Sequence, residues 1–290
     1  MPTVTVTVTD ASGNVSAPAS ASWTVGGGAP LKVIGMSAPD AEWSQRLSEV
    51  GSNGIRARRI FGDLTAAGND RASIITAAHA ANMMPVMSYK VPSVANAITG
   101  SYDAWAQTAA TYLNSFNKPT AVTIWHEPRG DMTPAQFVQL HTRLMPIFAA
   151  KPNLTVGPVL NGFLLDTANG RTEFAQYTSP ALFGIWDWFG MDVYQTGDAA
   201  SPGPIGPGDR IQPCVDFLTG LGQTGFPILI GEFNAFSAAN ITEAMNEILD
   251  EPSVQTALLF NSSTGAKGVV LTGSMLTAFQ TGKADPRVLQ

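Results

Sequence analysis

The chain has 290 residues, which suits one large domain with a small attachment or two ordinary domains, and its hydrophobic fraction of 44% excludes a disordered chain. The formal net charge is −6, and the sixteen Lys and Arg residues form no long stripe, so a nucleic acid is not an expected partner. No apolar run reaches the roughly 18 residues of a membrane-spanning helix, and a single cysteine, Cys214, excludes an internal disulfide.

The first thirty residues differ in pattern from the rest. Residues 3–9 alternate Thr and Val, a turn cluster follows, and residues 15–25 form a second, less regular run. This pattern predicts a β-hairpin, and the Gly-rich stretch 26–30 predicts a linker. The hairpin resembles the last strands of a bacterial immunoglobulin-like or fibronectin-like module, which implies upstream β modules in a longer chain. We therefore expect a partial β module with its linker over 1–29 and a separate domain over 30–290.

From Leu31 onward, short apolar runs alternate with amphipathic segments. Eight buried strands are expected at 31–36, 54–61, 84–89, 121–127, 154–160, within 185–194, and at 226–232 and 254–261. Helices are expected at 40–50, 70–81, 102–116, 211–221 and 269–279. Two more are expected to begin at N-caps, one at Thr133 with Gln136 at N3 and one at Asn240 with Glu243 at N3. Such alternation indicates a parallel sheet with crossover helices, and eight units of this size predict an α/β fold of the (β/α)₈ TIM barrel type.

Two of the expected strands end in a glutamate. Glu127 follows the run Thr-Ile-Trp-His, and Glu232 follows Pro-Ile-Leu-Ile-Gly, 105 residues later. That spacing is close to three barrel units of about 31 residues each, so both carboxylates are expected on the C-terminal rim. A single glutamate in this position is as easily a solvated strand end, but the matched pair favours a site. Two facing carboxyl groups can cleave a glycosidic bond, one as proton donor and one as nucleophile or base.

Other residues are candidates for orienting the carboxylates. His126 precedes Glu127, and Tyr194 ends strand six beside Glu232, where its hydroxyl is expected to keep that carboxylate ionised. Arg58 or Arg59, at the end of strand two, are candidates for the same role, and the sequence leaves open which of them faces the pocket.

The remaining candidates are aromatic and amide side chains. Trp125 is expected to line a sugar subsite, whereas Trp186 and Trp188 fit a subsite or the barrel core equally well. Tyr89 and Asn161, at the ends of strands three and five, are further candidates for substrate binding. No metal or other cofactor is expected, because the chain has only three histidines and His126-Glu127 lacks the second histidine of a zincin motif.

These segments resemble the clan A glycoside hydrolases, and most of all glycoside hydrolase family 26. In that family a histidine precedes the acid/base glutamate, as in His126-Glu127 here. Residues 186–194 are similar to the family's strand six with its tyrosine, 227–233 to its strand seven, and 54–61 to its arginine-bearing strand two. The resemblance implies a retaining enzyme without a cofactor, in which Glu127 is the acid/base and Glu232 the nucleophile.

The chain departs from the family pattern in two places. Pro128-Arg129-Gly130 follows the acid/base without the family's tryptophan, and strand eight ends in Phe260-Asn261-Ser262, where the clan often places a tryptophan. These differences bear on the substrate more than on the reaction.

The sequence thus predicts a retaining, endo-type hydrolase of a cell-surface or plant polysaccharide, extracellular or virion-associated, with its two carboxyl groups about 5–5.5 Å apart. The alternative is a catalytically inactive barrel that serves as a carbohydrate-binding module of a phage tail or adhesin.

Overall fold

The computed structural model describes residues 3–6, 19–22, 31–265 and 267–290. The chain divides into two compact units, residues 1–30 and 31–290. In the first unit, β1 (Thr3–Val6) and β2 (Ala19–Ser22) pair antiparallel, with Thr3 opposite Ser22. This pair agrees with the predicted hairpin, while its membership of an immunoglobulin-like module stays a prediction. The predicted turn and linker lie outside the described residues.

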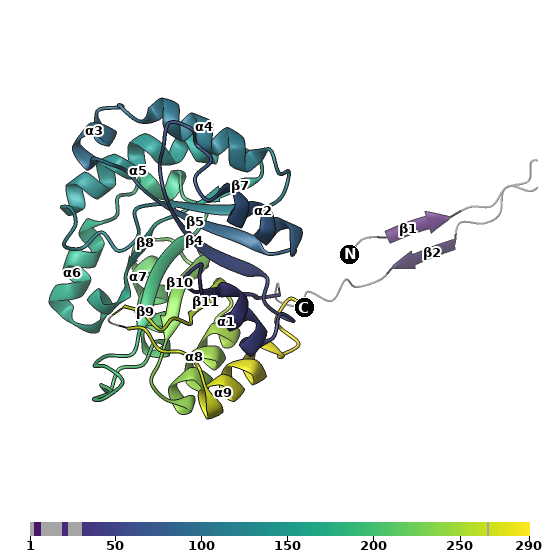
Figure 1. The fold of residues 1–290 in the computed structure, drawn as a ribbon. Helices are drawn as coiled ribbons and strands as arrows, with labels where there is room; N and C mark the ends of the chain where they lie inside the picture. Colours follow the sequence, from purple (N-terminus) through teal and green to yellow (C-terminus); the bar gives the residue numbers. More distant parts are fainter. Residues whose placement is uncertain (1–2, 7–18, 23–30, 266) are drawn as a thin grey trace, which may run out of the picture. The chain divides into compact units, whose positions relative to one another are not determined.

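The second unit is organised around a curled parallel sheet, with helices along its outer side (Figure 1). Its described strands are β3 (Val33–Ser37), β4 (Ala57–Asp63), β5 (Met84–Lys90), β6 (Thr120–Ile124), β7 (Leu154–Val156), β8 (Val159–Asn161), β9 (Phe189–Tyr194), β10 (Ile228–Asn234) and β11 (Val254–Phe260). They lie in the order β7-β6-β5-β4-β3-β11-β10-β9-β8. The arrangement is that of a TIM-barrel-like α/β fold.

The two strands at the ends of this order, β7 and β8, are neighbours in the chain. Only Gly157 and Pro158 separate them, and together they occupy the predicted fifth strand. A side chain at Gly157 would collide with Trp188, so glycine is needed where the strand is interrupted. Val159 of β8 also forms a parallel bridge with His126, just beyond β6. The eight predicted strands are therefore all present, with the fifth in two pieces.

Helices follow most of the strands. They are α1 (Trp43–Val50), α2 (Ala72–Ala80), α3 (Val94–Ile98), α4 (Asp103–Asn114), α5 (Pro134–Ala149), α6 (Ala168–Gln176), α7 (Ile211–Gly220), α8 (Ala238–Asp250) and α9 (Gly273–Lys283), with short 3₁₀ turns η1 (Gly162–Asp166), η2 (Leu182–Gly184) and η3 (Gly208–Arg210). The sequence did not predict α3, which has five residues, or α6, of which only Gly170 and Phe174 are buried. Among the described helices, none is long and apolar enough to cross a membrane.

The predicted caps have different outcomes. The capping box of α5 is confirmed, because Thr133 Oγ1 accepts from Gln136 N at 3.2 Å and Thr133 N donates to Gln136 Oε1 at 2.9 Å. The prediction that Asn240 caps α8 is wrong. Ser237 caps α8, and its hydroxyl accepts from Asn240 N at 3.2 Å. Ser and Asn are equally good caps, so the residue types did not distinguish the two positions.

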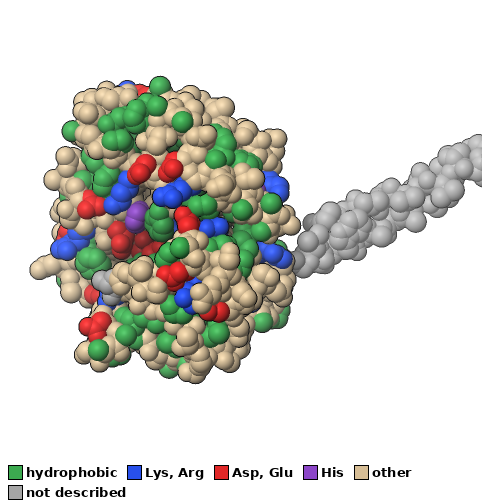
Figure 2. Space-filling view, in the orientation of Figure 1, with side chains coloured by type: hydrophobic (Ala, Val, Ile, Leu, Met, Phe, Trp, Pro, Cys, Tyr) green, Lys and Arg blue, Asp and Glu red, His purple; other side chains and the backbone are tan. Residues whose placement is uncertain are grey.

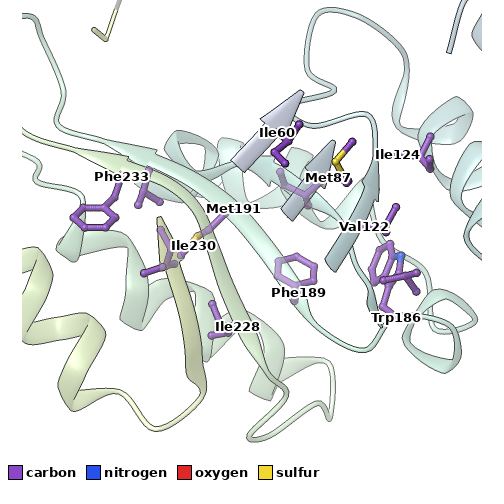
Figure 3. Close-up of a cluster of buried hydrophobic side chains, with 14 of the residues drawn as sticks. Ile60, Met87, Val122, Ile124, Trp186, Phe189, Met191, Ile228, Ile230 and Phe233 are labelled. Carbon is purple, nitrogen blue, oxygen red and sulfur yellow. The ribbon is translucent and has the colours of Figure 1, made fainter. Parts of the chain in front are cut away.

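Apolar side chains pack on both faces of the sheet. The larger cluster lies between the sheet and the helices, and Figure 3 shows part of it, including Ile60, Met87, Phe189 and Met191. A separate cluster forms on the other face, from Ala57, Val86, Ala121, Val159, Trp188, Leu229 and Leu258. This inner cluster lies toward the strand starts, and polar residues are found toward the C-terminal ends, where a barrel keeps its site.

Candidate active site

Glu232 lies inside β10, and its side chain is buried between two hydroxyl donors. Ser37, the last residue of β3, donates from Oγ to Glu232 Oε1 at 2.5 Å. Tyr194, the last residue of β9, donates its hydroxyl to Oε2. Hydrogen bonds to the charged form favour an ionised carboxylate. The sequence predicted the Tyr194 contact but missed Ser37, whose only signal is its position directly after the first apolar run.

Glu127 lies in a short segment beyond β6, which ends at Ile124 and not at 127 as predicted. The backbone there is held in unusual conformations, with φ of +66° at Trp125 and +48° at Glu127. Glu127 N donates to Val159 O at 2.8 Å, which ties the segment to β8. Left-handed conformations of non-glycine residues cost of order 1–3 kcal/mol each and are concentrated at functional sites.

The Glu127 carboxyl group has a different environment from that of Glu232. Burial, followed by the charge of Glu232, raises the pKa of Glu127 to about 7, although Arg59 and Lys90 act in the opposite direction. Glu127 can therefore keep a proton near neutral pH. Figure 2 shows a face of the molecule with a hollow at which carboxylates, in red, lie beside a histidine, in purple.

His126 is arranged to orient neighbouring groups. Its Nδ1 lies 2.8 Å from Ser88 Oγ, and its ring centroid is 4.9 Å from that of Phe61. Burial, with smaller effects of Arg59 and Lys90, lowers the pKa of His126 to about 3. The imidazole is therefore neutral at physiological pH, and its remaining N–H is too weak an acid to act as a proton donor in catalysis.

The structure decides between the two arginines of β4. Arg59 is fully buried, and its Nη2 lies 4.0 Å from Asp192 Oδ2. Arg58 instead donates to Asp40 Oδ1 at 3.0 Å and lies 4.1 Å from the Trp43 ring centroid. Arg59 is thus the arginine that lies beside the carboxyl groups, whereas Arg58 is bound to Asp40.

Asp192 is a third carboxyl group near the two glutamates, and the sequence reasoning missed it. Its Cα is the register partner of Glu232, and neither of its carboxylate oxygens has a hydrogen-bond partner in the described part of the chain. Burial raises the pKa of Asp192 well above its ordinary value, Arg59 opposes this, and the charges of Glu232 and Glu127 raise it further. The available signal was its spacing, since Asp192 and Tyr194 are two residues apart and lie on the same face of β9.

Trp125 and Asn161 lie beside the acid/base segment. Trp125 Nε1 donates to Asp131 Oδ2 at 2.9 Å, and Lys90 Nζ lies 4.8 Å from the Trp125 ring centroid. Asn161 Oδ1 accepts from Arg129 N at 3.0 Å, and its side chain also moderates the raised pKa of Glu127.

Two predicted site residues lie elsewhere. Tyr89 packs on the helix-facing side of β5, with its ring centroid 6.1 Å from that of Phe148. Side chains alternate along a strand, so Tyr89 faces away from the site when its neighbour Ser88 faces His126. Trp188 precedes β9 and belongs to the inner apolar cluster, where its Nε1 donates to Thr155 Oγ1 at 3.3 Å.

Trp186 is likewise a core residue, buried to 3% exposure, and its Nε1 donates to His141 Nδ1 at 3.1 Å. No group of three or more His, Cys, Asp or Glu side chains suited to a metal ion occurs within 31–265 and 267–290.

Comparison with known proteins shows which solved structures have a similar fold. No protein-family model and no curated protein sequence matches the chain. Among solved structures, GH26C from a Muricauda species is 12% identical with a TM-score of 0.60, covering 90% of this chain and 87% of its own. Endoglucanase Cel5A from Thermotoga maritima is also 12% identical, with a TM-score of 0.55 and coverage of 85% and 96%.

A glucosidase from Croceicoccus marinus is similar at 12% identity and a TM-score of 0.58, covering 88% of this chain and 67% of its own. These structural neighbours include clan A glycoside hydrolases, and family 26 is among them. The resemblance predicted from the sequence is confirmed. At this identity the likeness concerns the fold.

Proposed function

We propose that this protein is a retaining, endo-acting glycoside hydrolase that cleaves a polysaccharide through a covalent glycosyl-enzyme intermediate. One observation carries the proposal. A buried and a half-buried carboxyl group have opposite environments, because Glu232 accepts two O–H donors whereas desolvation and a neighbouring charge raise the pKa of Glu127 to about 7. Double displacement requires such a pair, in which one carboxyl group is the nucleophile and the other donates the proton.

In the first step, ionised Glu232 attacks the anomeric carbon while Glu127 gives its proton to the departing oxygen. The glycosidic bond breaks, and an ester forms between Glu232 and the sugar. Forming this ester removes the negative charge of Glu232, which is one cause of the raised pKa of Glu127. The pKa of Glu127 then falls, which suits it to take a proton from the water that hydrolyses the ester.

The test is a screen of polysaccharides with product analysis. Wild type is expected to release sugar, and Glu232→Gln is expected to lose that activity, while the control Glu247→Gln on the exposed side of α8 retains it. Proton NMR of the first product should show the anomeric configuration of the substrate. An inverted product would overturn the retaining mechanism and its expected separation of about 5–5.5 Å.

A different result would favour the alternative function. Glycan binding without hydrolysis by wild type would indicate an inactive barrel that serves as a carbohydrate-binding module of a phage tail or adhesin. An extracellular or virion-associated location belongs to the same proposal, and it rests on the β pattern of the first thirty residues.

A further inference from the structure

Three hollows follow one another along the rim. The first, of about 290 Å³, is lined by Ser37 and Phe61 among others, and the second, of about 340 Å³, by Phe61 and His126. The third, of about 440 Å³, is lined by Asp63 and Trp105. Adjacent hollows share residues, because Phe61 lines the first and second and Asp63 lines the second and third.

The first two hollows border the catalytic carboxyl groups. Ser37, in the first, is hydrogen-bonded to Glu232, and His126, in the second, directly precedes Glu127. The third hollow contains no residue of the catalytic site. Asp63 ends β4, Trp105 lies in α4, and the rest of the lining comes from the loops that follow β4 and β5, namely Leu64, Thr65, Ala66 and Pro92.

Aromatic rings lie at the centre and at the far end of this series. Phe61 is 38% exposed, and it is positioned by the His126 ring at 4.9 Å and the Arg59 guanidinium at 5.2 Å. Trp105 packs on Tyr102, with ring centroids 4.7 Å apart. Such rings offer rigid apolar faces, to which the C–H face of a sugar is complementary.

Three cations line the first two hollows. Arg59 is fully buried, 4.0 Å from Asp192, and the other two, Arg71 and Lys90, are paired with carboxylates nearer the surface. Arg71 lies 3.4 Å from Asp40 and 3.6 Å from Asp70, and Lys90 lies 3.3 Å from Asp131. In the third hollow, the one charged residue among those described is Asp63. A chain of anionic sugars would find repulsion there and no free cation.

We propose that the third hollow is a distal sugar subsite with Trp105 as its platform, which takes an uncharged glycan chain that passes over Phe61 from the catalytic carboxylates. This inference rests on the proposed function, because the path of the glycan chain is taken to start at the catalytic carboxylates. It adds a binding position that the carboxylates do not require, and it makes the enzyme selective for long chains.

The kinetic test uses cello-, manno- and xylo-oligosaccharides of two to six units. In wild type, kcat/KM should rise steeply with length. Trp105→Ala should reduce the ratio of kcat/KM for the longest chain to that for the shortest about three- to tenfold, the range expected for one aromatic contact. Trp105→Phe should recover part of the ratio. Leu221→Ala, a change at an exposed apolar residue just beyond α7 and outside the three hollows, should leave the ratio unaltered.

A binding test separates this inference from the proposed function. In the Glu232→Gln background, calorimetry should show that the longest neutral oligosaccharide binds several-fold more weakly after Trp105→Ala, and that oligogalacturonate of equal length binds poorly. If wild type binds but does not hydrolyse, the function fails and the subsite stands. An equal loss for short and long chains, equal binding of oligogalacturonate, or failure of every neutral series to bind would overturn the subsite.

Discussion

Two hydroxyl groups hold the carboxylate that we assign as nucleophile. Ser37 and Tyr194 each donate to a different oxygen of Glu232. A hydrogen bond to a charged group contributes about 1.5–3 kcal/mol, so the loss of either donor should be measurable.

Tyr194→Phe should lower kcat/KM roughly ten- to hundredfold. The charged form of Glu232 would lose one of its two donors, and its carboxylate would be held less firmly in the orientation needed for attack. The fold should persist because the ring remains. Tyr112→Phe on α4 is the control and should leave kcat/KM unchanged. Equal kcat/KM values for both variants and wild type would contradict the role of Tyr194.

The pKa of Glu127 predicts the basic limb of the pH–rate profile. Because burial and the charge of Glu232 raise that pKa to about 7, the protonated acid is lost above this pH, and kcat/KM should fall on the alkaline side of about pH 7. A basic limb that stays well above this value would show that another group donates the proton.

The same shift affects stability. Folding raises the pKa of Glu127 from 4.5 to about 7, so the folded state binds the proton more tightly, and the free energy of unfolding should fall as pH rises through this window. In Glu127→Gln this part of the pH dependence should disappear, as urea titrations between pH 4 and 8 would show. A dependence identical to that of wild type would place its origin elsewhere.

The sequence predicted those site residues that adjacency in the chain reveals. His126 neighbours Glu127, and Tyr194 ends the strand next to Glu232. Arg59 shares the face of β4 with buried Ala57, but the sequence does not show which face is inward. Asp192 was missed because an acid within an apolar strand is recognised only when its partner from another strand, Arg59, is known.

At the scale of elements, the capping box of α5 offers a direct measurement. Thr133→Ala removes the hydroxyl that accepts from Gln136 N, so the free energy of unfolding should drop by about 0.5–2 kcal/mol. Thr142→Ala, in the exposed middle of the same helix, is the matched control and should cost less. Equal losses in urea denaturation would mean that the cap does not limit stability.

Strands were predicted better than the chain between them. Apolar runs such as 84–89 and 226–232 identify buried strands directly, and the structure differs from them by a few residues at the ends. The interruption between β7 and β8 was not predicted, because it depends on the contact of Gly157 with Trp188, which is distant in the sequence. Helix α6 lacks an apolar stripe, so its pattern indicated no helix.

At the scale of the whole molecule, we expect the two compact units to be independent. Deleting residues 1–28 should leave the melting temperature and the activity nearly unchanged, because we expect the β pattern to belong to another module, and a Gly-rich stretch separates it from residue 31. Calorimetry and a hydrolysis assay of the shortened chain would test this. A large loss of either property would show that the first unit stabilises the second.

The positive φ of Glu127 has a consequence for evolution under selection. Glycine adopts φ of +48° without steric cost, and Glu127→Gly also removes a carboxyl group whose burial disfavours its charge. Compared with Glu127→Ala, which keeps the strained backbone, the glycine variant should be more stable by about 1 kcal/mol. A library selected for thermal stability alone would therefore drift toward glycine at this position and lose its chemistry, so the glutamate would persist only in lineages that use the reaction.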